Sequence, residues 1–283
     1  MKTVIISSDK WKNKCREDQF LLNSLLNNGI ECEIKSWQEN IDWAEYELLI
    51  LRSPWDYYER YEDFCDWLHM LEKNSIRIAN GARNILCNTD KQQQFIKMSD
   101  CEVPLIPYYV ANSVSEAIEW YENSNYDKVV IKPSISASGH NTYLIDSNSE
   151  LFDKLQIIMN QGHCVIMQPF VKNIERGEIS LVYFHGVFSH GVLRYPGIIG
   201  ARKKAVLLTE IDDEWLLAGE KICRYIGAKS LLYVRIDLVM YRDKITIMEI
   251  EMSEPDLYLT LDSEGTRIKH FILEIEKEMK KTL

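Results

Sequence analysis

Short apolar segments alternate with amphipathic ones along the first 80 residues. Residues 3–7 and 30–35 have the pattern of short strands, and YELLILR, which ends at Arg52, is a continuous apolar run typical of a central parallel strand. Periodic apolar positions predict helices over about 11–28 and 61–73. This alternation predicts an open parallel sheet, in which ligands bind beyond the carboxyl ends of the strands.

The pattern changes in the middle of the chain. Ser113 with Glu116 and Ser147 with Glu150 are two predicted capping boxes, each at the start of a helix. Between them, YDKVVIKPSISASGHNTYLI has the pattern of two strands joined by a loop of small hydroxylated residues, and HCVIMQPFV follows as a further strand. These features predict a compact α+β unit.

Alternating apolar and polar positions dominate the last third of the chain. Four segments (ISLVYF, VFSHGVLRY, LLYVRIDLVMY and KITIMEIEM) are predicted strands, and helices are predicted over about 214–226 and 266–281. The sequence shows no internal repeat and no long linker. An α/β unit followed by α+β units is therefore the predicted architecture.

Three carboxylates are predicted to converge on the last of these strands. Glu249 and Glu251 are two apart and point to the same side of a strand, and Asp237 stands twelve residues before Glu249. If the two strands pair across the YRDK turn, the three side chains share one patch. Bare carboxylates this close repel unless a divalent cation lies between them, and oxygen ligands favour Mg²⁺. A solvated acidic hairpin remains the alternative for these residues alone.

Other residues have the chemistry of a nucleotide site. Lys132 ends an apolar strand, where it could carry a positive charge to a phosphate, and the loop 134–142 could fold over a polyphosphate through its hydroxyls and backbone N–H groups. In MQPFV a strand end could pair with an adenine edge while Phe170 packs on the ring, and Glu178 could accept hydrogen bonds from a ribose. Taken singly, a lysine at the end of a strand is usually an exposed side chain, and a serine-rich turn is usually a turn that binds no ligand.

Together, the order of these residues resembles the ATP-grasp superfamily, in its D-alanine:D-alanine ligase and glutathione synthetase branch. The series is Lys91, Lys132, a small-residue loop, a hinge at Gln168 to Val171, Glu178, Arg235-x-Asp237 and Glu249-x-Glu251. More narrowly, RSPWDY, the GEISLVYF segment and EIEMSEPDLYL resemble a subgroup of stand-alone ligases of natural-product and amino-acid metabolism, among them the cycloserine-forming one. The resemblance covers essentially the whole chain.

The resemblance implies an α/β and α+β fold in three parts. A Rossmann-like domain would span residues 1–85, a small ATP-grasp subdomain with the phosphate loop would span 86–171, and a C-terminal ATP-grasp subdomain with the metal site would span 172–283. ATP would lie between the two ATP-grasp subdomains.

The resemblance also implies roles for the matching residues. Asp237, Glu249 and Glu251 would hold magnesium, as two ions or with manganese in their place, and Arg235 would steady the transferred phosphoryl group and the tetrahedral intermediate. Arg194 resembles a phosphate-contacting residue of the family. The predicted ATP-binding residues are Lys91, Lys132, Ser136, Ser138, Gly139, Gln168, Pro169, Phe170, Val171 and Glu178. Position 251 is Glu where many relatives have Asn, the loop has a single glycine, and the role of Arg202, Lys203 and Lys204 stays open.

The reaction that the resemblance implies is ATP-dependent carboxylate–amine ligation. The γ-phosphoryl group would pass to a substrate carboxylate, and an amine would then attack the acyl phosphate to give an amide or peptide-type bond, on an amino acid or small metabolite. No enzyme nucleophile is needed, in keeping with the absence of a Ser-His-Asp or Cys-His signature. A non-catalytic ATP-binding module and a phosphotransferase are the alternatives.

The predicted substrate pocket lies between the first domain and the acidic strands. Arg52 could pair with a carboxylate, Asp56 or Glu254 could hold an ammonium group, and Trp55 could form an apolar wall. Its predicted residues are Arg52, Ser53, Trp55, Asp56, Ser253 and Glu254. Arg52 and Asp56 could instead pair with each other and brace their loop.

Composition adds bounds to this interpretation. A net charge of −10 disfavours nucleic acid or an anionic membrane as the main partner. The apolar run near the N-terminus is too short for a secretory core, and seven scattered cysteines without a C-x-x-C pair fit free thiols, so a cytoplasmic protein is expected. The sequence leaves open the acid and the amine, whether the acceptor is free or bound to a carrier protein, and whether the chain forms a homodimer.

Overall fold

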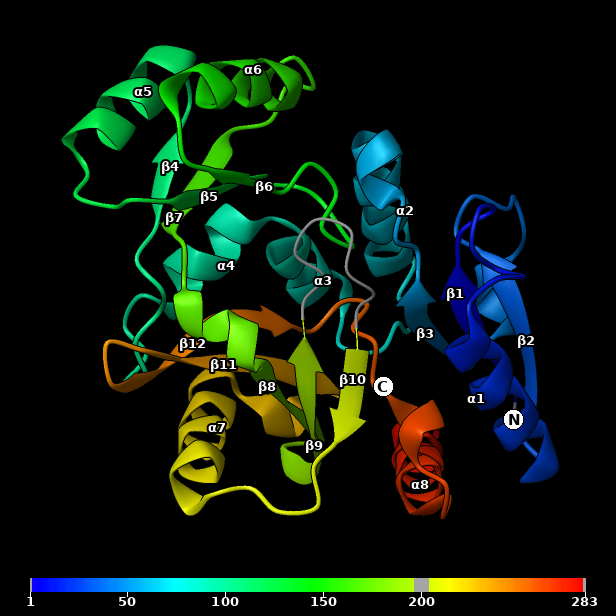
Figure 1. Cartoon of the computed structure of the whole chain (residues 1–283). Coiled ribbons are helices and arrows are strands. Elements are labelled where there is room, and N and C mark those ends of the chain that lie inside the picture. Colours follow the sequence, from blue (N-terminus) through cyan, green and yellow to red (C-terminus); the bar gives the residue numbers. More distant parts are fainter. Residues whose placement is uncertain (1, 196–203, 282–283) are drawn as a thin grey trace.

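Three β-sheets organise the part of the chain that the structure describes, residues 2–195 and 204–281 of a computed structural model (Figure 1). In the view of Figure 1, the N-terminal sheet lies on the right, the middle sheet at the upper left, and the largest sheet below. The C-terminal helix α8 (Thr266–Lys280) lies below the N-terminal sheet and beside the largest one.

The N-terminal sheet is parallel, as the sequence predicted. Its order is β2 (Glu31–Ser36), β1 (Lys2–Ser7) and β3 (Leu48–Ser53), and every residue of β3 is buried. Helix α1 (Arg16–Asn27) connects β1 to β2, α2 (Tyr61–Lys73) follows β3, and both pack against these strands. Helix α1 begins five residues later than predicted, because the preceding residues form turns.

The middle sheet is antiparallel, in the order β4, β7, β5 and β6. Its strands are β4 (Tyr109–Ala111), β5 (Val129–Pro133), β6 (Tyr143–Ile145) and β7 (Val165–Pro169), and its helices are α5 (Val114–Asn123) and α6 (Asn148–Met159). Ser113 caps α5, with its Oγ accepting the N–H of Glu116 at 3.2 Å, whereas Ser147 forms no side-chain cap on α6. The second predicted capping box is therefore wrong.

The largest sheet has the order β10, β9, β8, β11 and β12. Its strands are β8 (Glu178–Phe184), β9 (Val187–Tyr195), β10 (Lys204–Leu207), β11 (Val234–Tyr241) and β12 (Lys244–Glu251), and α7 (Asp213–Ile226) packs on it. Strands β11 and β12 form the predicted hairpin, in which Arg242 and Asp243 turn the chain with φ values of 49° and 60°.

Short helices complete the described chain. The sequence analysis missed α3 (Ala82–Thr89) and α4 (Lys91–Met98), which link the N-terminal sheet to the middle unit. Single 3-10 turns are η1 (Trp43–Glu45), η2 (Tyr57–Arg60), η3 (Lys172–Arg176), η4 (Ala228–Ser230) and η5 (Leu259–Leu261). No helix among the described residues has the length and apolar character needed to cross a bilayer.

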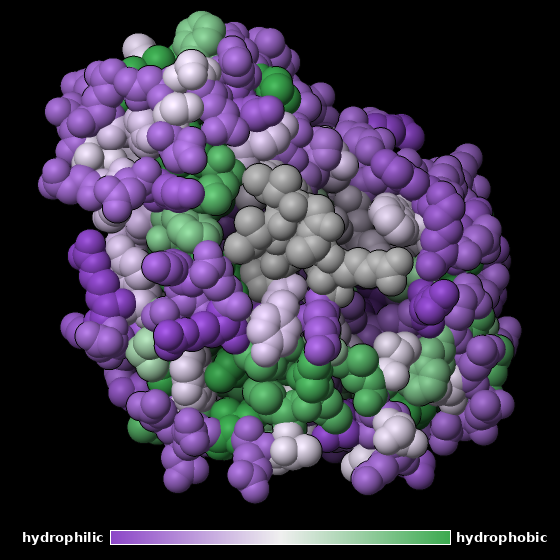
Figure 2. All heavy atoms as spheres, in the orientation of Figure 1, coloured by the Kyte–Doolittle hydropathy of each residue, from purple (hydrophilic) through white to green (hydrophobic). Residues whose placement is uncertain are grey.

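One hydrophobic core joins the two ends of the chain. Ile5 and Leu21 of the N-terminal unit pack in the same cluster as Phe184, Tyr233 and Phe271. Because dense packing resists relative displacement, this shared core fixes the N-terminal sheet against α8 and against β8 of the largest sheet. Hydrophilic residues cover most of the face drawn in Figure 2, and hydrophobic residues gather low in the view.

Candidate active site

A cavity of about 760 Å³ lies where the three sheets approach one another. Side chains from the middle sheet, from the largest sheet and from the N-terminal unit line it. The predicted residues among them are Trp55, Lys91, Lys132, Ser136, Ser138, Gly139, Gln168, Pro169, Phe170, Val171, Glu178, Arg194, Arg235, Asp237, Glu249, Glu251, Ser253 and Glu254. The structure thus brings together residues that are up to about two hundred positions apart in the chain.

The hairpin register places the three carboxylates together, as the sequence predicted. Asp237 on β11 lies opposite Glu249 on β12, and Arg235 lies opposite Glu251. Oxygens of the three carboxylates lie within 4.8 Å of one another. Asp237 is fully buried, whereas the side chains of Glu249 and Glu251 remain 28% and 25% exposed toward the cavity. The exposed pair is therefore the part of the cluster that an incoming ion can reach.

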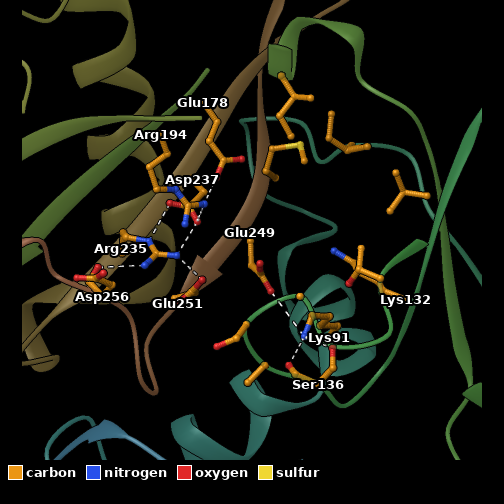
Figure 3. A pocket seen from close by; sticks show the side chains of 18 of the residues that line it. Lys91, Lys132, Ser136, Glu178, Arg194, Arg235, Asp237, Glu249, Glu251 and Asp256 are labelled. Carbon is orange, nitrogen blue, oxygen red and sulfur yellow. Dashed lines mark hydrogen bonds and ion pairs between the residues drawn. The ribbon is translucent and has the colours of Figure 1, made fainter. Parts of the chain in front are cut away.

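Two arginines neutralise the buried end of this cluster (Figure 3). Arg235 donates from Nε and Nη2 to the two oxygens of Asp237, each at 3.0 Å, and its Nη2 also contacts Glu251. Arg194 donates to Asp237 Oδ2 at 2.8 Å. Burial alone would raise the pKa of Asp237, but the two guanidinium groups outweigh it and hold that pKa below its ordinary value. The expectation that only a metal ion could relieve the repulsion is therefore wrong for Asp237.

Two lysines face the other end of the cluster. Lys91, the first residue of α4, has Nζ 3.8 Å from Glu249 Oε1, and Lys132 on β5 lies nearby in Figure 3. Burial would raise the pKa of Glu249, but attraction to Lys91 and Lys132 holds it below its ordinary value. Burial lowers the pKa of Lys132. Both lysines are thus desolvated cations at the wall of the cavity, which suits them to meet an anionic ligand.

The predicted lid loop, residues 134–142, is packed down over the lysines. Lys91 Nζ donates to the carbonyl oxygen of Ser136 at 2.7 Å, and the Tyr57 hydroxyl donates to the same carbonyl at 3.3 Å. His140 stacks on Tyr58 with ring centroids 4.3 Å apart. Gly139 has φ of +75°, a conformation that a side chain would strain. The loop therefore reaches from the middle sheet to the N-terminal unit.

The predicted hinge forms another wall of the cavity. Gln168 and Pro169 end β7, and Phe170 and Val171 continue it into the cavity lining. The Phe170 N–H donates a hydrogen bond to the Lys128 carbonyl oxygen at 2.9 Å. Apolar residues that sequence reasoning missed complete a slot here, namely Ile106, Leu144, Ile174 and Met248. They lie in four separate segments, and no local motif marks them.

Glu178, the predicted ribose ligand, is buried at the start of β8 and contacts Arg194. It lines the cavity, so its carboxylate lies within the site but already has a cationic partner. Arg194 bridges it to Asp237, which places one guanidinium between two of the predicted functional carboxylates.

The predicted substrate residues divide into two groups. Trp55, Ser253 and Glu254 line the cavity, whereas Arg52, Ser53 and Asp56 do not. Arg52 is only 1% exposed and donates to Glu17 at 2.6 Å. Ser53 is bonded to Ser7 at 2.6 Å and contacts Asp18.

The prediction that Arg52 faces the cleft is therefore wrong. The reason is the parallel sheet itself, because the residues at the end of β3 turn their side chains toward α1, whose first turn supplies Glu17 and Asp18. The alternative pairing of Arg52 with Asp56 is not formed among the described contacts either, since Arg52 pairs with Glu17 instead.

Sequence reasoning missed several residues that shape this end of the site. Asn88 on α3 accepts the N–H groups of Met252 and Ser253, at 2.6 and 3.0 Å, and Asp256 and Tyr258 line the cavity. The SEPDLY segment was a signal for the last two, since it follows the acidic strand directly. Arg202 and Lys203 lie outside the described residues, whereas Lys204 begins β10 and lines the cavity.

Similarity to known proteins agrees with this geometry. The family model described as D-cycloserine synthetase DcsG, N-terminal domain, matches residues 3–80. The cycloserine biosynthesis protein DcsG of Streptomyces lavendulae is 25% identical over 271 residues, which cover 87% of this chain and 88% of that protein. The crystal structure of D-cycloserine synthetase DcsG superposes with a TM-score of 0.87 at 20% identity, covering 99% of this chain and 100% of that one.

More distant structures carry the same fold. A RimK domain protein ATP-grasp from Sphaerobacter thermophilus has a TM-score of 0.72 at 14% identity, covering 95% of this chain and 97% of that one. A D-alanine–D-alanine ligase from Bacillus anthracis has a TM-score of 0.68 at 14% identity, covering 99% and 97%. The chain therefore has the ATP-grasp fold, and the predicted resemblance to ATP-grasp ligases, including the cycloserine-forming one, is confirmed. The enzyme class that these similarities support is ATP-dependent ligation.

Proposed function

We propose that this chain is an ADP-forming carboxylate–amine ligase that works through an acyl phosphate. The observation that carries the proposal is one cavity in which three carboxylates on a hairpin face two lysines and a phosphate-type loop. We assign the three sheets to domains over 1–85, 86–171 and 172–283, with the nucleotide between the last two.

ATP fits the nucleotide end of this cavity. The hinge 168–171 would meet the adenine edge, Glu178 the ribose, and Lys91, Lys132 and Arg194 the phosphates, with the hydroxyls and N–H groups of the lid loop above them. Glu249 and Glu251, with Asp237 behind them, offer oxygen ligands of the kind that Mg²⁺ takes. When bound, magnesium would neutralise the charge on phosphate oxygens. We propose that two magnesium ions bind here, or manganese ions in their place.

The ligation itself needs the chain to bind, orient and stabilise charge. Lys91 and Lys132 would hold the transferred phosphoryl group beside the substrate carboxylate, and the closed lid would exclude water that could hydrolyse the acyl phosphate. Arg235 would donate to the oxyanion that forms when the amine attacks. Because no enzyme nucleophile takes part, positioning and charge account for the catalysis.

The acceptor end is acidic. Oε2 of Glu254 is buried and has no hydrogen-bond partner among the described residues, and Asp256 lines the cavity near it in the chain. A buried carboxylate oxygen without a partner favours a cationic ligand, such as the ammonium group of an amino acid. Trp55, whose indole N–H donates to the Glu254 carbonyl at 3.1 Å, would wall this subsite. Small amino acids or related metabolites are therefore the proposed substrates, free or carrier-bound.

A phosphotransferase would use the same nucleotide end, so product analysis separates the two. We would supply MgATP with amino acids singly and in pairs and measure ADP and phosphate. A ligase releases both only when acid and amine are present together, whereas a kinase needs one acceptor and keeps the phosphate on it. If no amino acid or pair raises phosphate release above the rate measured with MgATP alone, the remaining function is that of a nucleotide-binding module.

We place this reaction in the cytoplasm. All seven cysteines, which lie within the described residues, are free thiols, as expected in a reducing compartment that also supplies ATP.

A further inference from the structure

The segment after β12 is held by side chains from other units. Residues 252–258 form neither helix nor strand, so the buried N–H groups of this segment need partners outside a ladder. The N–H of Leu257 donates to Glu17 Oε1 at 2.9 Å, and the N–H of Leu259 donates to Glu17 Oε2 at 2.8 Å. Glu17 belongs to α1 and thus comes from the opposite end of the chain.

Arg52 braces this carboxylate from behind. Its Nη2 donates to Glu17 Oε1 at 2.6 Å, so the buried Glu17 carboxylate accepts three hydrogen bonds. The Nε and Nη1 of Arg52 have no hydrogen-bond partner among the described residues. A buried ion pair whose donors are partly unpaired usually stabilises a fold less than apolar side chains in the same place would. Such a pair can, however, hold the groups that it contacts in one defined orientation.

The same segment holds the proposed oxyanion donor. Arg235 Nη1 donates to the carbonyl of Asp256 at 3.0 Å, and its guanidinium carbon lies 5.8 Å from the ring centroid of Tyr258. The Tyr258 hydroxyl accepts from Arg194 at 3.4 Å. Residues that alternate along one short segment therefore contact Glu17 on one side and the two site arginines on the other.

We infer that Glu17, braced by Arg52, is a positioning residue of the ligation reaction, which sets the orientation of Arg235 through the backbone of residues 256–259. Glu17 does not line the cavity of about 760 Å³, but it lines a smaller cavity of about 210 Å³ beside it, together with Trp55 and Asp256. The role that we infer acts through the orientation of Arg235. The inference rests on the proposed function, in which Arg235 stabilises the oxyanion. It makes the N-terminal unit part of the catalytic geometry rather than only a wall for substrate.

The test compares Glu17→Gln with a matched control, Glu39→Gln. Glu39 belongs to the same unit, and its Oε1 also accepts two hydrogen bonds, one from the backbone N–H of Ser36 and one from the Lys12 ammonium group, each at 3.0 Å. With MgATP and the amino-acid pair found by the screen, Glu17→Gln should lower kcat by about 10- to 100-fold, the cost of misplacing a reacting group by about 1 Å. The KM for ATP should stay within about threefold of that of the unaltered protein.

Glu39→Gln should leave both constants within about twofold. A kcat for Glu17→Gln as high as that of the control, or a loss that appears only in the KM for ATP, would overturn the inference. If Glu17→Gln does not fold, Glu17→Asp replaces it, because that variant keeps the charge beside Arg52 but withdraws the carboxylate from the two N–H groups; the same kcat loss is expected.

Amide hydrogen exchange makes the result independent of the substrates. Peptides covering residues 255–261 should exchange faster in the Glu17→Gln variant than in Glu39→Gln, because the Gln amide has one acceptor oxygen where Glu17 has two, so that one of the Leu257 and Leu259 N–H groups loses its acceptor. We call the hydrogen bonds between Glu17 and the backbone of residues 257–259 the clamp. Unchanged exchange in these peptides refutes the clamp, whether or not the ligase activity has been found. Absence of ADP formation by the unaltered protein, combined with faster exchange in the variant, refutes the proposed function and leaves the clamp standing.

Discussion

Charge balance governs the site at the scale of single residues. Asp237, with Arg194 and Arg235 on its oxygens, is satisfied without a further ligand, whereas Glu249 has only Lys91, at 3.8 Å, as a close ionic partner among the described contacts. Burial raises the pKa of Glu251, despite attraction to Arg235. The cavity end of the hairpin thus has carboxylate oxygens that the fold itself does not neutralise, and these are the ligands that a divalent cation requires.

Glu249→Gln therefore tests the metal site. Loss of this charge should reduce turnover by roughly 10²–10³-fold, the range for one preorganised electrostatic group, and should leave the melting temperature nearly unchanged. Phosphate release over a magnesium titration, together with a thermal melt, checks both. The control is Asp243→Asn, which removes an equal charge at the exposed turn of the same hairpin, where φ is 60° and Asn is well tolerated. Near-normal activity of the Glu249 variant at saturating magnesium would contradict the assignment.

At the scale of elements, the lid loop is the part whose order should depend on ligand. Its first half is anchored, because Ile135 and Ala137 pack in the hydrophobic core of the N-terminal unit and Lys91 donates to Ser136. Its tip is exposed at Ser138, Gly139 and Thr142, and this is the part that we expect to gain order. Lys91 would meet phosphate in the nucleotide complex, so the loop would exchange a contact with the protein for contacts with ATP. Such loops are drawn from the least stable parts of a fold.

ATP should accordingly protect residues 134–142 from proteolysis and from amide exchange. The comparison is between MgATP and magnesium alone, and the exposed turn around Gly29 at the end of α1 serves as an internal control because it lies outside the cavity lining. Equal protection in both loops, or in neither, would count against the lid.

The sequence predicted the elements where pattern and spacing act locally. The β11–β12 hairpin follows from alternation and a short turn, so the sequence predicted that Asp237, Glu249 and Glu251 share one patch. The register shift between Asp237 and Leu238, which sets Asp237 opposite Glu249, was not predicted. Arg52 could not be placed, because its direction depends on Glu17, which lies 35 residues away in another element. Likewise Ser147 has the sequence of a cap but leaves the helix uncapped, since the side chain has other rotamers available and nothing in the pattern selects among them.

At the scale of the whole molecule, α8 ties the two ends of the chain to the catalytic sheet. His185, in the turn between β8 and β9, has Nδ1 2.8 Å from Glu274 and Nε2 2.8 Å from Glu278, both on α8. Lys277 and Lys281 on the same helix contact these two carboxylates, and His270 and Arg77 lie against them as well. The imidazole therefore bridges two carboxylates within a balanced cluster.

This bridge should make stability depend on pH. The hydrogen bond to Glu278 is the main cause that raises the pKa of His185, and the same contact helps to hold the pKa of Glu278 at about 2. Because the folded pKa of His185 is raised, its contribution is complete below the unfolded value of about 6.5 and is lost as pH rises through the folded value. The Glu278 contribution is present above its unfolded value of about 4.3 and is lost as pH falls toward the folded one.

Thermal melts of the unaltered protein and of His185→Gln between about pH 5.5 and 9 check this, a window that spans the ordinary His pKa. The difference in melting temperature should be largest at the acid end and should shrink as pH rises. A difference that stays constant across the range would mean that the bridge is made by a neutral imidazole.

The central claim is that the γ-phosphoryl group of ATP passes to a carboxylate of the substrate. The most direct measurement uses the active acid labelled with ¹⁸O in its carboxyl group, with the amine and MgATP, and mass analysis of the phosphate released. An acyl phosphate intermediate transfers one labelled oxygen to phosphate in each turnover, because the attacking amine expels that oxygen with the phosphoryl group. Phosphate free of label, or label found in AMP, would contradict the account.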